Sequence, residues 1–477
     1  MAALCGALVV SAAGVGGTNA AAKQARVATP ASATMPGLFT ATITVNTSAK
    51  AVGGITNHFA GLSFESRTLN SGDFVDSGNL PQLLRNLGTS IMRFGGNTVD
   101  DGSFPGISPS ALIGLAGLAR ASGWTVLYSE DLGHYDAAAV TADASQVATA
   151  LGPRLAAIAC GNEPDAYGGN GDRPSPYTVA EYLKDAAACL AAVRADAPSA
   201  PLEGADLTGA ASWLLAYANQ ESGHLAYLGQ HLYIAGCVKD YAGQTALQAD
   251  AKLLSPALVT RAVSNFKWVV ADAKIARARP IMSETNSICS GGLAGVSNSY
   301  AAALWAIDYM LTGAENGVYG MNFHDRFTAS CTPYSPLCPV PGQPGEFTAE
   351  PLYYGMLFAH LLGTGSLLPV AVRVPSTSDN VTAFALKPAT GGLRLIVENL
   401  TGQHTSLTLS VGGRATSASV LHLTAPGLTA TSGVRIQGAA VGASGTIKPG
   451  PPTVIKCSAG KCQLTLTPHT AVLVAIP

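Results

Sequence analysis

The chain has 477 residues, of which 48% are hydrophobic and only 12% are charged, and its formal net charge is −2. This length is sufficient for one large domain and a smaller one. The near-neutral charge and the absence of basic runs exclude an electrostatic binder of nucleic acid or of anionic membranes.

The first segment, residues 1–35, is rich in alanine, glycine and valine and carries almost no charge. Residues 2–15 resemble the apolar core of a signal peptide, and small residues near Ala20 offer a cleavage site. No positive charge precedes this run, since the first are Lys23 and Arg26. A disordered leader and a membrane anchor are the alternatives, but the run is short for an anchor. We predict a signal peptide and a secreted or extracytoplasmic protein, without a membrane span in the mature chain.

Nine cysteines are present, and removal of Cys5 with the signal peptide leaves an even number. Cysteines close in sequence can close small disulfide loops, which is typical of an oxidising compartment. The candidate pairs of this kind are Cys331 with Cys338 and Cys457 with Cys462. Cys237 and Cys289 both follow predicted strands and are a further candidate pair. Cys160 and Cys189 are interpreted as buried thiols. No Cys-x2-Cys or His-x3-His spacing predicts a zinc site.

Residues 38–48 alternate apolar residues with threonine, which is the period of a half-exposed strand. From about residue 55, strand-like and helix-like segments then alternate. The predicted strands are 58–65, 90–94, 125–129, 155–161, 201–206, 227–233, 280–284 and 317–324. The helix-like segments are 80–87, 109–121, 143–151, 179–195, 256–276 and 299–314. Two of these helices open with a serine N-cap followed by proline, at Ser108 and Ser255.

Eight such repeats predict an α/β fold, a (β/α)8 or TIM barrel, over residues 53–365. The rival is an open doubly wound sheet, in which a glycine-rich nucleotide loop would follow the first strand. The sequence there, Gly61-Leu-Ser-Phe-Glu-Ser66, is not such a loop. We therefore predict the barrel.

After a helix-like run at 353–363, the chain becomes rich in threonine, serine, valine and glycine. Short alternating runs occur at 393–399, 406–411, 418–423, 453–456, 463–466 and 470–476. Turn residues separate them, which predicts an antiparallel β-sandwich. We assign residues 36–52 plus 366–477 to this second domain, with a structural role or, alternatively, as a carbohydrate-binding module.

Two glutamates stand at the carboxyl ends of predicted strands. Glu163 follows the strand 155–161, and Pro164 prevents regular structure from continuing. Glu284 ends the strand 280–284. The carboxyl ends of barrel strands form the catalytic rim. A retaining glycosidase needs one protonated carboxyl and one ionised carboxyl, so this pair predicts a glycoside hydrolase. A helix cap or a salt-bridge partner is the structural alternative for either glutamate.

Further polar side chains stand at strand ends: Glu65, Arg93, Asn97, His231, Tyr233, Asn322 and His324. Arg93 is expected to pair with a carboxylate and keep Glu284 ionised. His231 and Tyr233 face the same side of their strand, so both reach the site. Tyr233 is a candidate to orient Glu284, and a core aromatic is the alternative.

The two glutamates define a double-displacement mechanism. Glu163 donates a proton to the glycosidic oxygen while Glu284 attacks, which gives a glycosyl-enzyme ester. Glu163 then activates the water that releases the sugar. Asn162 is expected to bind the sugar 2-hydroxyl, a contact that strengthens in the transition state. The mechanism requires no metal and no cofactor, and we predict none.

At these residues the chain resembles the clan A retaining glycosidases, and within them glycoside hydrolase family 79, which contains β-glucuronidases and heparanase. The resemblance covers the barrel and the trailing sandwich. The motifs that carry it are Met92-Arg-Phe-Gly-Gly-Asn97, Gly161-Asn-Glu-Pro-Asp165, His231-Leu-Tyr-Ile-Ala-Gly236, Ser283-Glu-Thr-Asn-Ser287 with Ser290-Gly-Gly292, and Ala301-Ala-Ala-Leu-Trp305.

The resemblance implies that Glu163 is the acid/base, Glu284 the nucleophile and Asn162 the partner of the 2-hydroxyl. Tyr233 matches the tyrosine that supports the nucleophile. It further implies a sugar site lined by Glu65 and Asn97.

In this family, the loop after the nucleophile holds a uronic carboxylate through tyrosine hydroxyls and glycine amides. Gly291 and Gly292 are present here, but Cys289 stands where the loop tyrosine is expected. Tyr334, in the loop after the eighth strand, is the candidate to replace it. Arg326 lies close by in the sequence.

We therefore predict a secreted, exo-acting β-glucuronidase that removes terminal glucuronic acid from plant or proteoglycan glycans. The long insertion at 331–351 favours exo cleavage. One alternative is a retaining β-glycosidase for a neutral sugar such as xylose, galactose or arabinose. Another is a non-catalytic carbohydrate-binding surface protein.

Overall fold

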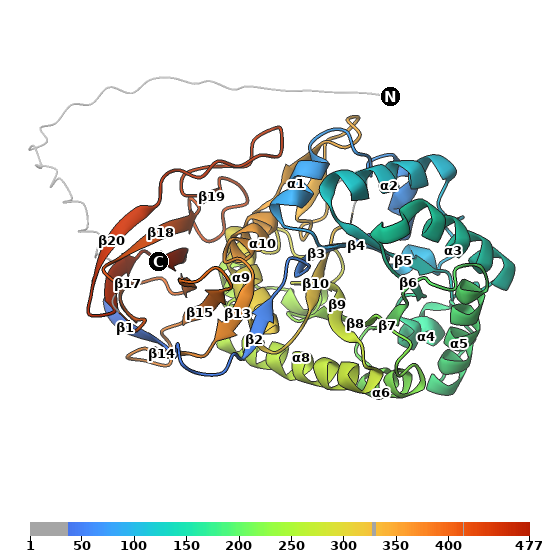
Figure 1. Ribbon diagram of the computed structural model, residues 1–477, viewed down its shortest axis with the longest axis horizontal. Coiled ribbons are helices and arrows are strands. Elements are labelled where there is room, and N and C mark those ends of the chain that lie inside the picture. The colour runs from blue at the N-terminus through green and yellow to red at the C-terminus, as the bar shows by residue number, and fades with distance from the viewer. Residues whose placement is uncertain (1–36, 327–330, 414) are drawn as a thin grey trace, which may run out of the picture. The chain divides into compact units, whose positions relative to one another are not determined.

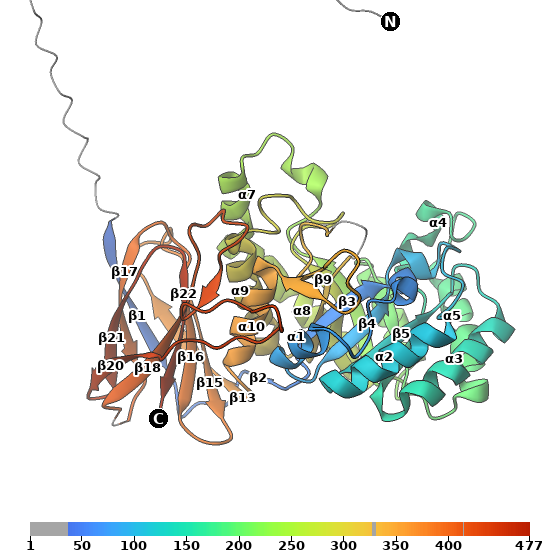
Figure 2. The same ribbon diagram turned by 90° about the horizontal axis from the view of Figure 1, so that it is seen from above.

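The computed structural model describes residues 37–326, 331–413 and 415–477, which belong to one compact unit. The predicted signal peptide at residues 1–35 lies outside the described residues. Within the unit, a barrel of parallel strands and a large curled sheet lie side by side (Figures 1 and 2). The predicted barrel with its second, β-rich part is confirmed.

The barrel is an eight-stranded parallel sheet with the order β6-β5-β4-β3-β10-β9-β8-β7. Its strands are β3 (Ala60–Glu65), β4 (Ile91–Gly95), β5 (Thr125–Glu130), β6 (Leu155–Cys160), β7 (Glu203–Leu207), β8 (Tyr227–Tyr233), β9 (Arg279–Asn286) and β10 (Gly320–His324). The two ends of this order meet at a parallel bridge between Ile158 and Leu202, which nearly closes the barrel. All eight predicted strands are present, with β9 two residues longer at its carboxyl end than expected.

Helices follow most strands and cover the outside of the barrel (Figure 1). They are α1 (Leu80–Asn86), α2 (Pro109–Ser122), α3 (Ala137–Leu151), α4 (Tyr167–Asn170), α5 (Val179–Asp196), α6 (Ala211–Gln220), α7 (Ala246–Leu253), α8 (Pro256–Ala276), α9 (Tyr300–Glu315) and α10 (Pro351–Leu361). The serine caps are confirmed, because Ser108 accepts from the Ala111 amide and Ser255 from the Leu258 amide. The sequence interpretation did not single out α4, α6 and α7.

The second part is a sheet of twelve strands that curls around its own core. In spatial order they are β14 (Val370–Arg373), β1 (Leu38–Val45), β17 (His404–Ser410), β21 (Lys461–Leu466), β20 (Thr453–Ser458), β18 (Ser417–Thr424), β22 (Thr470–Ile476), β16 (Leu393–Asn399), β15 (Val381–Pro388), β13 (Gly365–Leu368) and β2 (Gly53–Ile55), with β19 (Arg435–Ile436) beside β18. β1 pairs with β17 in parallel, whereas the neighbouring pairings are antiparallel. The early strand β1 therefore pairs with strands from the end of the chain.

Helices α9 and α10 run between the barrel and the curled sheet (Figure 2). Both are largely apolar, and nearly every residue of each is buried. A helix of this kind is stable only when it is covered on every side. Tyr300 at the start of α9 donates a 2.6 Å hydrogen bond to the Leu423 carbonyl of β18, which ties the helix to the sheet.

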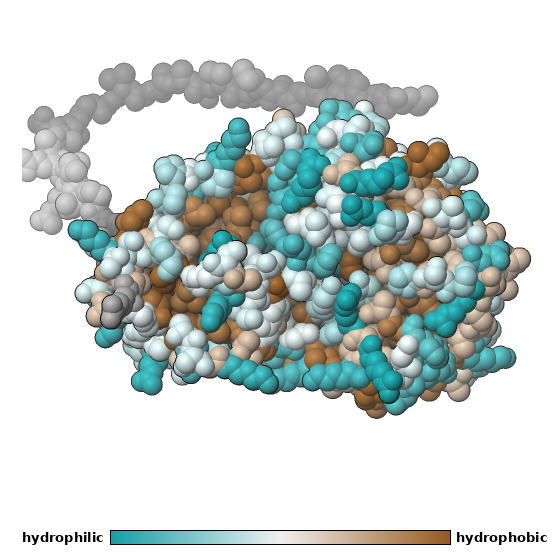
Figure 3. Space-filling model, in the orientation of Figure 1, coloured by the Kyte–Doolittle hydropathy of each residue, from teal (hydrophilic) through white to brown (hydrophobic). Residues whose placement is uncertain are grey.

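Four disulfides join cysteines of the described residues: Cys160–Cys189, Cys237–Cys289, Cys331–Cys338 and Cys457–Cys462. The interpretation of Cys160 and Cys189 as thiols is wrong, because packing of α5 on β6 brings the two sulfurs together. Disulfides are typical of proteins from oxidising compartments. None of the helices in the described ranges has both the length and the apolar character needed to cross a membrane. The face seen in Figure 3 mixes polar and apolar side chains.

Candidate active site

A pocket of about 630 Å³ opens at the carboxyl ends of the barrel strands. Eight of the predicted site residues line it: Glu65, Asn97, Glu163, His231, Tyr233, Glu284, Gly291 and Tyr334. They come from loops or strand ends far apart in the sequence. The parallel barrel brings them together because all its strands end at one rim.

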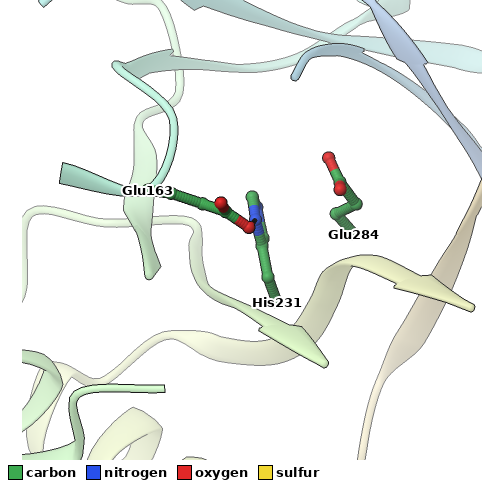
Figure 4. A group of neighbouring side chains, drawn as sticks. All are labelled: Glu163, His231 and Glu284. Atoms are coloured by element: carbon green, nitrogen blue, oxygen red, sulfur yellow. Dashed lines mark hydrogen bonds and ion pairs between the residues drawn. The ribbon is translucent and has the colours of Figure 1, made fainter. Parts of the chain in front are cut away.

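Glu163 lies in the loop after β6, where it caps a short 3-10 helix that begins at Pro164. Its φ of 54° lies in the left-handed region, which a non-glycine residue rarely adopts. Its backbone N–H donates a 2.7 Å hydrogen bond to the Asp206 carbonyl. The side chain reaches toward His231, whose Nδ1 lies 2.9 Å from Glu163 Oε1 (Figure 4).

Glu284 lies near the end of β9 and is 6% exposed. Tyr233 donates a 2.6 Å hydrogen bond to Glu284 Oε1, and Arg93 Nη1 lies 2.7 Å from Oε2. Burial alone opposes ionisation, but the charges of His324, His231 and Arg93 outweigh it and lower the pKa of Glu284 to about 2. The carboxylate is therefore ionised at neutral pH.

The two glutamates and His231 converge on one point. A carboxylate oxygen of Glu163, one of Glu284 and a ring nitrogen of His231 all lie within 4.8 Å of one another. Three such atoms have the spacing of metal ligands. However, Arg93 and the imidazolium of His231, whose pKa is raised to about 10, already place positive charge against both carboxylates. A cation at this point would meet that charge, so the donor set does not fit a metal.

Arg93 lies beneath the pocket and is fully buried. Besides Glu284, its guanidinium contacts Asn162 Oδ1 at 2.8 Å and Asp206 Oδ2 at 3.1 Å. Burial opposes its charge, but the carboxylates of Asp206 and Glu284 raise the pKa of Arg93 above its ordinary value. The expected pairing of Arg93 with Glu284 is therefore present, and a second carboxylate shares it.

Asn162 and Gly292 lie behind the residues that line the pocket. The Asn162 side chain is 4% exposed, accepts from Arg93 and donates to Asn97 Oδ1 at 3.2 Å. Gly292 has φ 84°, and a Cβ there would meet the Tyr334 backbone at 2.8 Å. Asn162 thus orients Asn97, and Gly292 lets the loop that carries Tyr334 approach.

The far side of the pocket is built around Glu65 and His324. His324 Nε2 lies 3.7 Å from Glu65 Oε1, and its Nδ1 lies 3.4 Å from Glu284 Oε2. The ring of Tyr334 packs edge-on against His324. Cys289 also lines the pocket, and its disulfide to Cys237 joins the loops that follow β8 and β9.

The sequence interpretation did not single out Asp206 and Glu203. Both lie on β7 and are at most 1% exposed, and Asp206 contacts Arg93 and His231. Asp206 ends a predicted strand, as Glu284 does. The same strand-end reasoning applied to the fifth strand would have indicated it.

No protein-family model matches the chain. It is 26% identical over 270 residues to the β-glucuronidase of Aspergillus niger, a match that covers 52% of this chain. The same match covers 48% of the Aspergillus protein, so the chain corresponds to about half of that relative's length.

Solved structures share the fold. A 4-O-α-L-rhamnosyl-β-D-glucuronidase from Fusarium oxysporum matches with a TM-score of 0.75 and 22% identity, over 91% of this chain and 100% of that one. A family 51 α-L-arabinofuranosidase from Bifidobacterium longum matches with a TM-score of 0.67 and 14% identity, over 93% of this chain and 100% of that one. At these identities the likeness concerns the fold.

Proposed function

We propose that the protein is a retaining glycoside hydrolase that releases glucuronic acid from β-glucuronides. The observation that supports this most directly is that a carboxylate oxygen of Glu163 and one of Glu284 lie within 4.8 Å of each other in an open pocket. Retaining enzymes place their carboxyls about 5–5.5 Å apart, whereas inverting enzymes leave about 6.5–9.5 Å for a water molecule. The short separation therefore supports retention.

Their surroundings give the two carboxyls different roles. Glu284 accepts from Tyr233 and pairs with Arg93, which suits an ionised nucleophile. Glu163, which begins the reaction protonated, gives its proton to the glycosidic oxygen as Glu284 forms an ester with the anomeric carbon. Ionised Glu163 then takes a proton from the water that cleaves the ester, and the starting state returns.

Two observations support an acidic sugar. The Aspergillus relative is a β-glucuronidase, and the Fusarium structure of similar fold is a glucuronidase. Arg326, His324 and the Tyr334 side chain face the same pocket. We propose that Tyr334 replaces the loop tyrosine expected at Cys289, and that the 331–351 insertion restricts the pocket to chain ends.

A neutral sugar is the second candidate. Cys289 is engaged in a disulfide and offers no hydroxyl to a uronic carboxylate. Arabinofuranosidases share the fold as well. The four disulfides support the accompanying proposal that the protein is secreted.

The test is turnover of p-nitrophenyl β-D-glucuronide by the wild type and by Glu284→Gln. We expect activity in the wild type only, and NMR of the first-formed sugar should show the β-anomer. If the wild type cleaves only a neutral β-glycoside, and does so only with Glu284 present, the proposed mechanism stands but the proposed glucuronic acid specificity is wrong. Inactivity on every glycoside tested would favour the binding-protein alternative.

A further inference from the structure

His231 lies between Glu163 and a second, buried carboxylate, that of Asp206. Its Nδ1 is 2.9 Å from Glu163 Oε1, and its Nε2 is 3.6 Å from Asp206 Oδ1. The first distance is a hydrogen bond and the second an ion-pair contact. His231 and Asp206 are each 1% exposed, so water does not screen the contact. Figure 4 shows the His231 ring with its nitrogen toward Glu163.

Besides the link through His231, a backbone hydrogen bond connects Asp206 with Glu163. The Glu163 N–H donates to the Asp206 carbonyl at 2.7 Å, and both residues have a positive φ, of 54° and 57°. The register between β7 and β8 shifts between Ala205 and Leu207, on either side of Asp206. Such irregularities re-aim a side chain, and residues strained in this way cluster at functional sites.

The strand next to β7 makes room for this arrangement. Gly229 lies on β8, and a Cβ there would collide with the carboxyls of Glu203 and Asp206. The Ser283 hydroxyl donates a hydrogen bond to Asp206 Oδ1. Burial and the neighbouring Asp206 raise the pKa of Glu203 well above its usual range. Burial acts the same way on Asp206, but the Arg93 charge outweighs it and lowers that pKa.

Charged groups surround His231 from every element packed against it. They are Glu163 after β6, Glu203 and Asp206 on β7, Arg93 on β4 and Glu284 on β9, with the phenols of Tyr182 and Tyr217 near the β7 pair. Burial opposes protonation of His231, but the charge of Glu284 and the contacts with Asp206 and Glu163 raise its pKa to about 10.

We propose that Asp206 is a positioning residue that holds His231 as a cationic hydrogen-bond donor to Glu163 Oε1. The inference rests on the proposed function. With Oε1 engaged by His231, the proton that Glu163 donates sits on Oε2. It passes from Oε2 to the glycosidic oxygen as the bond from that oxygen to the anomeric carbon breaks and Glu284 forms the ester. The His231 N–H then stabilises the negative charge left on Glu163.

Asp206→Asn tests the inference, because it removes the charge and keeps the shape. An alkyl alcohol leaves only when Glu163 protonates the glycosidic oxygen, whereas p-nitrophenolate is stable enough to leave with little acid assistance. General acid assistance contributes about 10²–10⁴-fold, so we expect kcat/KM for an alkyl β-glucuronide to fall about 100-fold. For p-nitrophenyl β-D-glucuronide we expect a fall below about 5-fold. An equal fall on both substrates would contradict a role through Glu163.

A second readout does not need activity. With ¹³C-labelled histidine, the His231 resonance, assigned by its loss in His231→Gln, should not titrate between pH 5 and 8 in the wild type. In Asp206→Asn it should titrate within that range, because the ion-pair partner of Nε2 is gone. An unchanged titration overturns the inference. If neither substrate is cleaved by the wild type, the proposed function fails, while this titration still decides the role of Asp206.

Two more variants test whether a folding defect, and not the loss of the Asp206 charge, explains the result. Ser283→Ala keeps every charge and removes only the hydroxyl that donates to Asp206. Its kcat/KM should also fall more for the alkyl glucuronide than for the p-nitrophenyl glucuronide, but by a smaller factor than in Asp206→Asn. Glu398→Gln changes a fully buried carboxyl of the curled sheet, outside the pocket, and should leave the ratio of the two activities unchanged.

Discussion

The guanidinium of Arg93 and the carboxylate of Glu284 meet at 2.7 Å in the barrel interior, with the arginine fully buried. Arg93 comes from β4 and Glu284 from β9, which are not neighbours in the barrel. The curvature of the barrel lets side chains from these two strands meet in its interior. The contact therefore links the integrity of the barrel to the ionisation of the proposed nucleophile.

Replacing Arg93 by methionine should destabilise the whole barrel. The change leaves Glu284 and Asp206 buried without their shared cation, and a broken buried ion pair typically costs about 3–5 kcal/mol. Denaturant unfolding followed by circular dichroism measures this loss. Arg120→Met, which removes an exposed arginine of α2, should change the free energy of unfolding by less than about 0.5 kcal/mol. Similar losses in the two variants would contradict a special role for the buried pair.

Tyr233→Phe should slow turnover while leaving the fold intact. It removes the 2.6 Å hydrogen bond to Glu284, and hydrogen bonds to charged groups are worth about 1.5–3 kcal/mol. We expect kcat/KM for the cleaved glycoside to fall about 10- to 100-fold. Tyr319→Phe, just before the amino end of β10, is the matched control and should retain wild-type activity. Full activity in Tyr233→Phe would show that the bond does not matter in the transition state.

Stability should fall as the pH rises from about 4 to 8, in part through Asp250. Burial raises the pKa of Asp250 to about 7, whereas an unfolded aspartate ionises near 3.8. Between these values the folded chain binds the extra proton, so stability decreases with pH. Asp250→Asn should raise Tm at pH 8 and leave it nearly unchanged at pH 4. The exposed Asp196→Asn should show no such difference, and a gain at both pH values would point to another cause.

Removing the Cys237–Cys289 disulfide should loosen the pocket rim. The bridge spans 52 residues, and chain entropy for such a loop amounts to about 4 kcal/mol. In the double serine variant we expect a lower Tm and a KM that rises more than kcat falls, because both cysteines line the pocket. The double serine variant of Cys457–Cys462, which spans 5 residues in the curled sheet, should lower Tm less and leave KM unchanged. A KM unaffected in both variants would argue against a role of the bridge in the pocket.

Several features of the site could be predicted because they are encoded locally. Glu163 follows an apolar run that ends at Gly161, and Pro164 marks the turn. His231 and Tyr233 are two residues apart in a strand, so the period of the strand places them on one face. Tyr233 reaches Glu284 and His231 reaches Glu163 from that face.

Other features had no local signal. Cys160 on β6 and Cys189 on α5 pair only because the helix packs on that strand. Glu203 lies within a fully buried strand, where hydrophobic periodicity predicts apolar side chains, and only Asp206 had a signal, from its place at the end of the predicted strand. The partners of Asp206, Arg93 and Ser283, come from distant segments, and the register shift at Asp206 is set by pairing with β8.

The sequence by itself determined the repeating strand–helix order and the residues that stand at strand ends, because both follow from short-range periodicity and turn chemistry. The tertiary structure alone decided that Glu163 and Glu284 approach within 4.8 Å, and that the charges of His324, His231 and Arg93 outweigh burial and lower the pKa of Glu284 to about 2. Distances across a barrel and the electrostatic environment of a buried carboxylate depend on strand register, curvature and the packing of distant segments. A local pattern carries no information about these quantities.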